Sequence, residues 1–488
     1  MRRFAFLFAL LIAARCFAAP HPVYVVLWFD TEDFIDPRSD DAAMEIAARL
    51  RALGVRATFK VVGEKARFLE KNGRHDVIEA LRFHDIGSHG NYHSLHPAPA
   101  EYLESMDLNE GAAQFYAHEI SGVRDVARIF GQYPSCYGQP GASFGPHKYL
   151  ALPKLGIPIY FDSVSHLDLD AQPFWYEGVL NELAGKPYLV RPSLESPPGI
   201  PEGRKEFDGA YAKLQAQGGG LVSVVYHPTE FVNAEFWDAA NFSRGASPRR
   251  GEWKLPKPHS EARIKRAYEV LEEFVEYGKS KPGVQFITVA EFGRIYTDLA
   301  PSRKLSSGQV KNLADSFQTR IDFARMGDYS LSAAEITAAM ASWTLADEPL
   351  RGQGIAIRTV LAPQSQGKSN PRNVHLTRDE WLDACRWADE FIRENGRLPA
   401  SVWYGIHSLS IEDFAATLAG DISAGYPGAP QVPIRQASCG FCERVALDDE
   451  KVFDWVIHPE GFRGPDILKL TRLLAWSLKP AVPPRIVR

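Results

Sequence analysis

Apolar runs and amphipathic segments alternate along the first 300 residues of the chain. Residues 23–29 are apolar and β-rich, long enough for one buried strand. Further strands are predicted at residues 55–62, 157–161, 221–226 and 284–288, with a short one ending at Gly87, and helices at residues 40–53, 76–82 and 261–277. Strands that alternate with helices indicate a parallel sheet. Seven or so of them favour an α/β fold of the (β/α) barrel type, closed or partly open.

The pattern changes near residue 300. Residues 300–310 combine Pro, Ser, Lys and Gly and are predicted to be a linker. Three later segments begin alike, at Leu331-Ser332, Leu376-Thr377 and Leu409-Ser410, each with an acidic residue three positions after the Ser or Thr. This spacing is typical of capped helix starts. We therefore predict a barrel over residues 19–299 and a smaller, mainly helical domain with its own core over residues 311–488.

Composition and charge narrow the class of protein. The 488 residues are 45% hydrophobic and 24% charged, as in soluble globular proteins, and exceed the usual length of one domain. The net charge of -5 and the absence of a Lys/Arg cluster argue against a nucleic-acid partner.

The first 18 residues have the pattern of a signal peptide. Arg2 and Arg3 precede an apolar run over residues 4–14, and small residues stand before Ala19. The run is too short to span a bilayer, and no later segment is long and apolar enough to do so. We expect a secreted or periplasmic protein.

Cys439 and Cys442 are separated by two residues, as in redox motifs and half-zinc sites. No second pair completes a tetrahedral site, and no strand-to-helix redox context surrounds the motif. The sequence therefore favours a local disulfide or two free thiols.

Acidic residues follow the first strand directly. Asp30, Glu32 and Asp33 lie within four positions at its carboxyl end, which is the edge where α/β enzymes keep their sites. Taken alone, such a run is also typical of a solvated loop. Alternation along an extended chain puts Asp30 and Glu32 on the same side.

Three histidines change that picture. His89, His93 and His96 follow the strand that ends at Gly87. A helical turn would put the rings of His89 and His93 on one side, a spacing that suits two nitrogen ligands of one divalent ion. His96 is a possible ligand or supporting partner. Without a metal, the segment would be a hydrogen-bonded polar turn.

A carboxylate completes this candidate metal site. Either Glu32 or, if the chain turns there, Asp33 is expected as the third ligand, with Asp30 free as a base. His227 follows the clearest strand and is expected at the same edge, where it could protonate a leaving amine.

These motifs together resemble the polysaccharide deacetylases, the NodB-homology group of carbohydrate esterases. The resemblance covers residues 23–296 and rests on residues 29–33, 58–63, 87–93 and 225–227. It implies an incomplete (β/α) barrel and a divalent metal ion, usually zinc. It further implies Asp30 as general base, Glu32 or Asp33 with His89 and His93 as metal ligands, and His227 as general acid.

One motif departs from the family. Where the family has an Arg-x-Pro motif that steadies the base, this chain has Gly138-Gln139-Pro140 after Cys136. An amide such as that of Gln139, or a backbone group, is then expected to hold the carboxylate, with no positive charge beside it. Asp162, after the next strand, is a further supporting candidate.

The C-terminal part carries a second resemblance. Residues 395–403 and 409–414 resemble pseudomurein-binding repeats, which implies attachment to cell-wall glycan. The alternative is an ordinary helical domain whose tryptophans are core residues.

Three functions follow. The first is a secreted, metal-dependent hydrolase that removes acetyl groups from N-acetylated sugars in a polysaccharide or peptidoglycan. The second is a hydrolase of another non-peptide C–N bond, such as a cyclic amide, on the same scaffold. The third is a glycan-binding protein without turnover.

Overall fold

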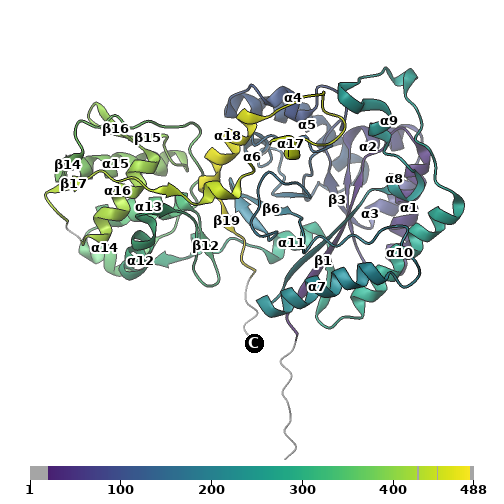
Figure 1. The fold of residues 1–488 in the computed structure, drawn as a ribbon, viewed down its shortest axis with the longest axis horizontal. Helices are drawn as coiled ribbons and strands as arrows, with labels where there is room; N and C mark the ends of the chain where they lie inside the picture. Colours follow the sequence, from purple (N-terminus) through teal and green to yellow (C-terminus); the bar gives the residue numbers. More distant parts are fainter. Residues whose placement is uncertain (1–19, 426–427, 448, 484–488) are drawn as a thin grey trace, which may run out of the picture.

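A computed structural model describes residues 20–425, 428–447 and 449–483. The predicted signal peptide lies outside the described residues. The chain forms a large α/β unit, purple to teal in Figure 1, beside a smaller, mainly helical unit in green. None of the helices in the described part is long and apolar enough to cross a membrane.

The α/β unit is built on parallel strands. They run in the order β3-β2-β1-β7, and β8 pairs with the start of β1. The strands are β1 (Val23–Thr31), β2 (Thr58–Val61), β3 (Asp85–Ser88), β4 (Ile159–Asp162), β6 (Val179–Leu183), β7 (Gly220–Tyr226) and β8 (Val284–Ile287). Single parallel bridges from Ser88 to Tyr137 and from Tyr137 to Tyr160 continue the array from β3 to β4. The result is a distorted, incomplete (β/α) barrel, as predicted.

Helices cover the outside of this barrel. They include α1 (Pro37–Ala52), α2 (Gly63–Lys71), α3 (His75–Arg82), α5 (Leu108–Phe130), α7 (Pro201–Gln217), α8 (Pro228–Val232), α10 (Glu261–Lys279) and α11 (Val289–Ile295). β1 is buried at nearly every position because it lies inside the sheet with helices over it. Because β1 is buried in the middle of the sheet, the carboxylates at its end lie at the inner rim of the barrel.

Each predicted helix start of the smaller unit is observed. Ser332, Thr377 and Ser410 each accept a backbone N–H three residues on. The helices are α12 (Ser307–Phe317), α13 (Ala333–Leu345), α15 (Arg378–Asn395) and α16 (Ile411–Ser423), beside the hairpin of β15 (Ser401–Tyr404) and β16 (His407–Ser410). Residues 300–310, predicted as a linker, contain β9 (Lys304–Leu305) and the start of α12.

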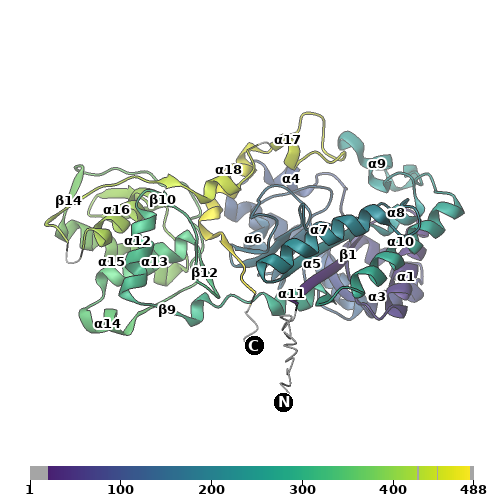
Figure 2. The same cartoon turned by 60° about the horizontal axis from the view of Figure 1, so that its bottom comes forward.

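The end of the chain returns to the barrel. β19 (Lys479–Pro480) pairs with β5 (Phe174–Tyr176), and α18 (Pro465–Leu474) lies between the two units in Figures 1 and 2. Apolar residues of the smaller unit, such as Phe414, belong to the same buried cluster as Tyr160 of the barrel. Along the returning chain, the apolar interiors of the two units are thus continuous.

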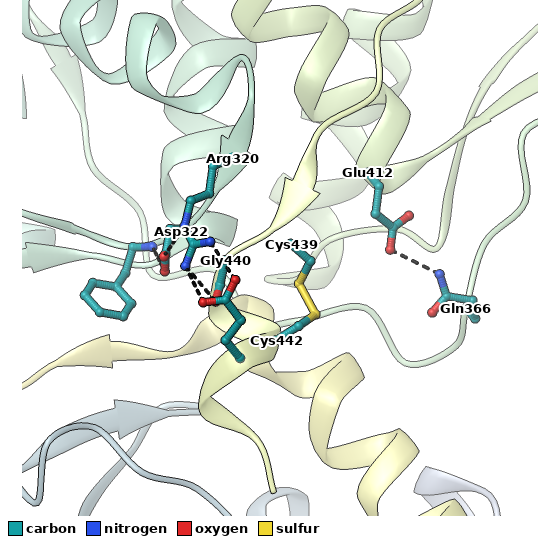
Figure 3. Close-up of a disulfide and its surroundings, with 9 residues drawn as sticks. Arg320, Asp322, Gln366, Glu412, Cys439, Gly440 and Cys442 are labelled. Atoms are coloured by element: carbon teal, nitrogen blue, oxygen red, sulfur yellow. Dashed lines mark hydrogen bonds and ion pairs between the residues drawn. A yellow bond between two sulfur atoms is a disulfide. The ribbon is translucent and has the colours of Figure 1, made fainter. Parts of the chain in front are cut away.

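Cys439 and Cys442 form a local disulfide, one of the two predicted outcomes. Figure 3 shows the bridge beside Arg320, whose guanidinium pairs with Asp322 and Glu443. Two further cysteines, Cys136 and Cys385, are buried free thiols.

Candidate active site

The carboxyl end of β1 carries two buried acids that face one interior point. Asp30 and Glu32 are each 4% exposed. The indole N–H of Trp237 donates to Glu32 Oε1 at 3.0 Å and holds that carboxylate in place. The expected alternation thus puts both acids where a reacting centre can form.

Asp33 has a different role from Glu32. Its Oδ1 accepts the backbone N–H groups of Ile35 and Asp36, and its Oδ2 accepts the hydroxyl of Thr229. These bonds fix the turn into α1 and leave Asp33 outside the group of potential metal ligands, in which Glu32 stands. Of the two acids left open by the sequence, the structure places Glu32 beside the histidines.

His89 and His93 meet at Glu32. His93 Nε2 lies 2.8 Å and His89 Nε2 lies 3.3 Å from Glu32 Oε2, and the two ring centroids are 5.1 Å apart. No helix brings them together: the chain turns with positive φ at Gly90 (78°) and His93 (53°). The predicted helical turn is therefore wrong, because Gly90 and His93 adopt the left-handed region and residues 89–93 form a non-helical turn.

The donor set fits a divalent metal ion. One carboxylate oxygen of Glu32 and one nitrogen each from His89 and His93 all lie within 4.8 Å of one another, and all three residues are buried. Two nitrogens and one carboxylate leave coordination positions open, as in catalytic sites.

Outer contacts orient His93. Its Nδ1 lies 2.6 Å from the hydroxyl of Ser94, which in turn donates to Asp238. Because that hydroxyl is used as a donor, Nδ1 carries the proton and donates to Ser94, which leaves the electron pair of Nε2 available to a metal ion beside Glu32.

His227 stands opposite this group, at the end of β7. Its Nε2 lies 3.7 Å from Asp30 Oδ2, and its Nδ1 lies 3.6 Å from Glu230 Oε2. The side chain is 21% exposed, compared with 6% or less for Asp30, Glu32, His89 and His93, so substrate can approach from the His227 side. Although burial alone lowers the pKa of His227, the charges of Glu32, Glu230 and Asp30 raise it to about 9.

Lys60 supplies a positive charge that the sequence analysis missed. Its ammonium lies 2.9 Å from Asp30 Oδ1 and donates to the carbonyl of Phe161 at 3.0 Å, and the side chain is fully buried. Lys60 lies on β2, directly opposite Asp30 in the parallel register. The expectation of a base with no cation beside it is therefore wrong.

The space for Lys60 depends on glycines. A Cβ at Gly138 would overlap the ammonium, and one at Gly87 would come 2.9 Å from Lys60 Cγ. Gly138 stands in the motif that lacks arginine, so the absent side chain leaves room for the lysine from the neighbouring strand. A charged residue inside a buried apolar strand is the signal that could have identified Lys60.

Gln139 and Asp162 do not contact Asp30. The side chain of Gln139 accepts from Lys148 and Tyr160. Asp162 accepts the backbone N–H of Gln139 at 2.6 Å. Burial alone would lower the pKa of Lys60, but Asp162 and Asp30 raise it, so Asp162 supports the lysine that pairs with the base.

His96 also lies outside the ligand group. Its Nδ1 is 2.8 Å from Glu101 Oε2, and its Nε2 is 3.4 Å from the carbonyl of Phe242. It supports the loop that carries the other two histidines.

The electrostatics suit Asp30 as a base. Burial raises the pKa of its carboxyl, but His89, Lys60 and His227 outweigh this effect, and the pKa lies below its ordinary value. The carboxyl is thus ionised at neutral pH while His227 is protonated, the pairing that acid–base catalysis needs.

We expect Glu230→Gln to move the basic limb of the pH–activity profile to lower pH. Glu230 raises the pKa of His227, and removing its charge lets the imidazolium deprotonate earlier as pH rises. The measurement is kcat/KM against pH, with Glu235→Gln as the control because, among the described residues, the backbone N–H of Lys257 is the only hydrogen-bond partner of the Glu235 carboxylate. An unmoved basic limb would argue against His227 as the acid.

Comparisons with known proteins support a likeness in fold. No protein-family model matches the sequence, and no curated protein matches it. Polysaccharide deacetylases are among the solved structures that resemble this chain. One, from Mycobacterium smegmatis and assigned to that group, is 15% identical, with a TM-score of 0.35, over 57% of this chain and 93% of its own.

Two further solved structures also resemble this chain. A Streptococcus mutans CE4 esterase is 15% identical with a TM-score of 0.32, over 55% of this chain and 85% of its own. The PuuE allantoinase is 16% identical with a TM-score of 0.35, over 56% of this chain and 93% of its own. These scores are too low for function to be transferred, so function has to be derived from the residues of the site.

Proposed function

We propose that this protein is a metal-dependent hydrolase that removes acetyl groups from N-acetylated sugars of a polysaccharide or peptidoglycan. The observation that carries the proposal is the convergence of Asp30, Glu32, His89, His93 and His227 from three distant segments on one buried rim. A solvated acidic loop or a structural histidine cluster would not place a base and an acid 3.7 Å apart beside a ligand group.

Glu32, His89 and His93 would hold the metal ion, and zinc fits their nitrogen and oxygen atoms. When bound, such an ion lowers the pKa of water and polarises a carbonyl.

The chain's own groups move the protons. Asp30 takes a proton from the attacking water. At the same time the oxygen of that water bonds to the amide carbonyl carbon. His227 then gives a proton to the amide nitrogen as the C–N bond breaks, so acetate and a free amine leave. Lys60 holds the Asp30 carboxylate at the point of attack.

Metal analysis tests the ligand group. We expect close to one divalent ion per chain in the wild type, lost in His89→Ala and retained in His96→Ala, since His96 is held by Glu101 outside the group. The measurement is metal content by mass spectrometry after dialysis. A metal-free wild type would overturn the enzyme proposal and leave the glycan-binding alternative.

A substrate screen tests the reaction. We expect acetate release from N-acetylated oligosaccharides or peptidoglycan by the metal-loaded protein. Turnover of small cyclic amides without acetate release would instead support the second hydrolase hypothesis. Tight glycan binding with neither reaction would support a binding protein.

We also propose export from the cytoplasm and contact with cell-wall glycan through the smaller unit. Trp343, Trp381 and Trp476 are core residues, as the alternative interpretation expects, but Trp403 on the β15–β16 hairpin is 46% exposed. An exposed indole suits stacking on a sugar ring.

A further inference from the structure

A hollow lies between the barrel and the returning C-terminal segment, on the side of the candidate active site. It encloses about 520 Å³. Backbone N–H groups of Arg244 and Gly245 donate to the carbonyls of Val456 and Ile457 and tie its two walls together. The yellow segment crosses the barrel toward α9 (Trp237–Phe242) in both views (Figures 1 and 2).

Trp455 connects this hollow to the reacting groups. Its indole N–H donates to Asp238 Oδ2 at 2.6 Å, and Asp238 also accepts from Ser94, the residue bonded to His93. Its ring packs at 5.2 Å against Phe236, which packs at 5.0 Å against His227. The hollow therefore lies on the side of His227, the most exposed group of the site, from which the substrate can approach.

The lining of the hollow combines aromatic rings with positive charge. Phe453 and Phe462 lie 5.3 Å apart, and His458 stacks on Phe462 at 5.0 Å. Arg244 and Arg463 also line it, and no acidic residue does so in the part of the chain that the structure describes. Aromatic faces bind sugar rings, and guanidinium groups bind carboxylates through paired hydrogen bonds.

We propose that this hollow binds the sugar unit next to the one that is deacetylated, and that this unit is anionic. The inference rests on the proposed function and narrows its substrate class from N-acetylated glycans in general to those that also carry carboxylates. The returning segment, residues 453–463, thus completes the substrate groove of the barrel.

Arg244 allows a clean test. It is exposed, and no hydrogen bond or ion pair within the described part of the chain engages its guanidinium, so Arg244→Gln removes charge without breaking such a contact. Arg249 is exposed on the same loop but does not line the hollow, which makes Arg249→Gln the matched control. The substrates are a hexasaccharide of alternating N-acetylglucosamine and glucuronate, and the same hexasaccharide with its carboxylates methyl-esterified.

In the wild type we expect a lower KM for the acidic hexasaccharide than for its ester. Arg244→Gln should raise the KM for the acidic form about five- to tenfold, with kcat unchanged, as expected for the loss of one charge-assisted contact. The KM for the ester should not change in Arg244→Gln, and Arg249→Gln should have the wild-type KM for both substrates. The proposal would be overturned if Arg244→Gln changed the KM for the acidic hexasaccharide and for its ester equally. It would also be overturned if Arg244→Gln and Arg249→Gln changed the KM for the acidic form equally.

Calorimetric binding of the acidic hexasaccharide separates this inference from the proposed function. Binding that is weakened by Arg244→Gln, without any acetate release, would refute deacetylation and keep the anionic subsite. Acetate release from the neutral ester with no preference for the acid would keep deacetylation and refute the subsite.

Discussion

Asp30→Asn should lower kcat by about 10²- to 10⁴-fold, the usual contribution of a general base, while metal content stays at the wild-type level. The amide keeps the shape of the carboxylate but cannot take a proton from water. Asp30 also stands outside the ligand group of Glu32, His89 and His93. The measurement pairs steady-state acetate release with metal analysis of the same preparation.

Asp33→Asn is the matched control for Asp30→Asn. Asp33 follows Asp30 by three residues, and its carboxylate accepts hydrogen bonds from the backbone N–H groups of Ile35 and Asp36 and from the hydroxyl of Thr229. We expect some loss of stability from this variant, with metal content and kcat near wild type. Loss of the metal in Asp33→Asn would instead make Asp33 the third ligand and refute the assignment to Glu32.

Lys60→Met should have the second-largest effect, on both stability and turnover. Removing one partner of a buried ion pair leaves the Asp30 carboxylate uncompensated and costs about 3–5 kcal/mol of unfolding free energy. Among the folded molecules kcat should fall, since the base loses the group that positions it. Loss of the positive charge also raises the pKa of Asp30, so the acid limb of the pH–activity profile should move to higher pH.

Lys65→Met separates positioning from folding. Lys65 is as buried as Lys60 and pairs with Asp40 at the start of α1. It also donates to the backbone carbonyl of Asp33, so it supports the turn after β1 and not the carboxylate of Asp30. We expect a similar drop in melting temperature but an unchanged kcat and an unchanged acid limb. If both lysine variants lose kcat equally and neither shifts the profile, Lys60 has only a structural role.

The local pattern of residues is enough to predict the main strands and helix starts and most residues of the candidate site. β1 and β7 are continuous apolar runs, so their ends, and hence Asp30 and His227, could be placed on one edge before any contact was known. The capped starts at Ser332, Thr377 and Ser410 are equally local, because each depends on residues three positions apart.

The turn that joins His89 and His93 was predicted with the wrong geometry. Spacing alone cannot distinguish a helical turn from a non-helical turn with positive φ at Gly90 and His93, because both can bring residues four apart onto one side. The choice between Glu32 and Asp33 likewise depended on Thr229, which is 196 residues further on.

The sequence by itself determined the strand–helix rhythm, the acidic strand end, the histidine pair and the late histidine, since each is written in neighbouring positions. Only the tertiary structure decided that Lys60 neutralises Asp30 and that Trp455 reaches the active-site rim from the far end of the chain. Both depend on which strands and loops become neighbours. That is settled by the burial of apolar surface over the whole fold and not by any local pattern of residues.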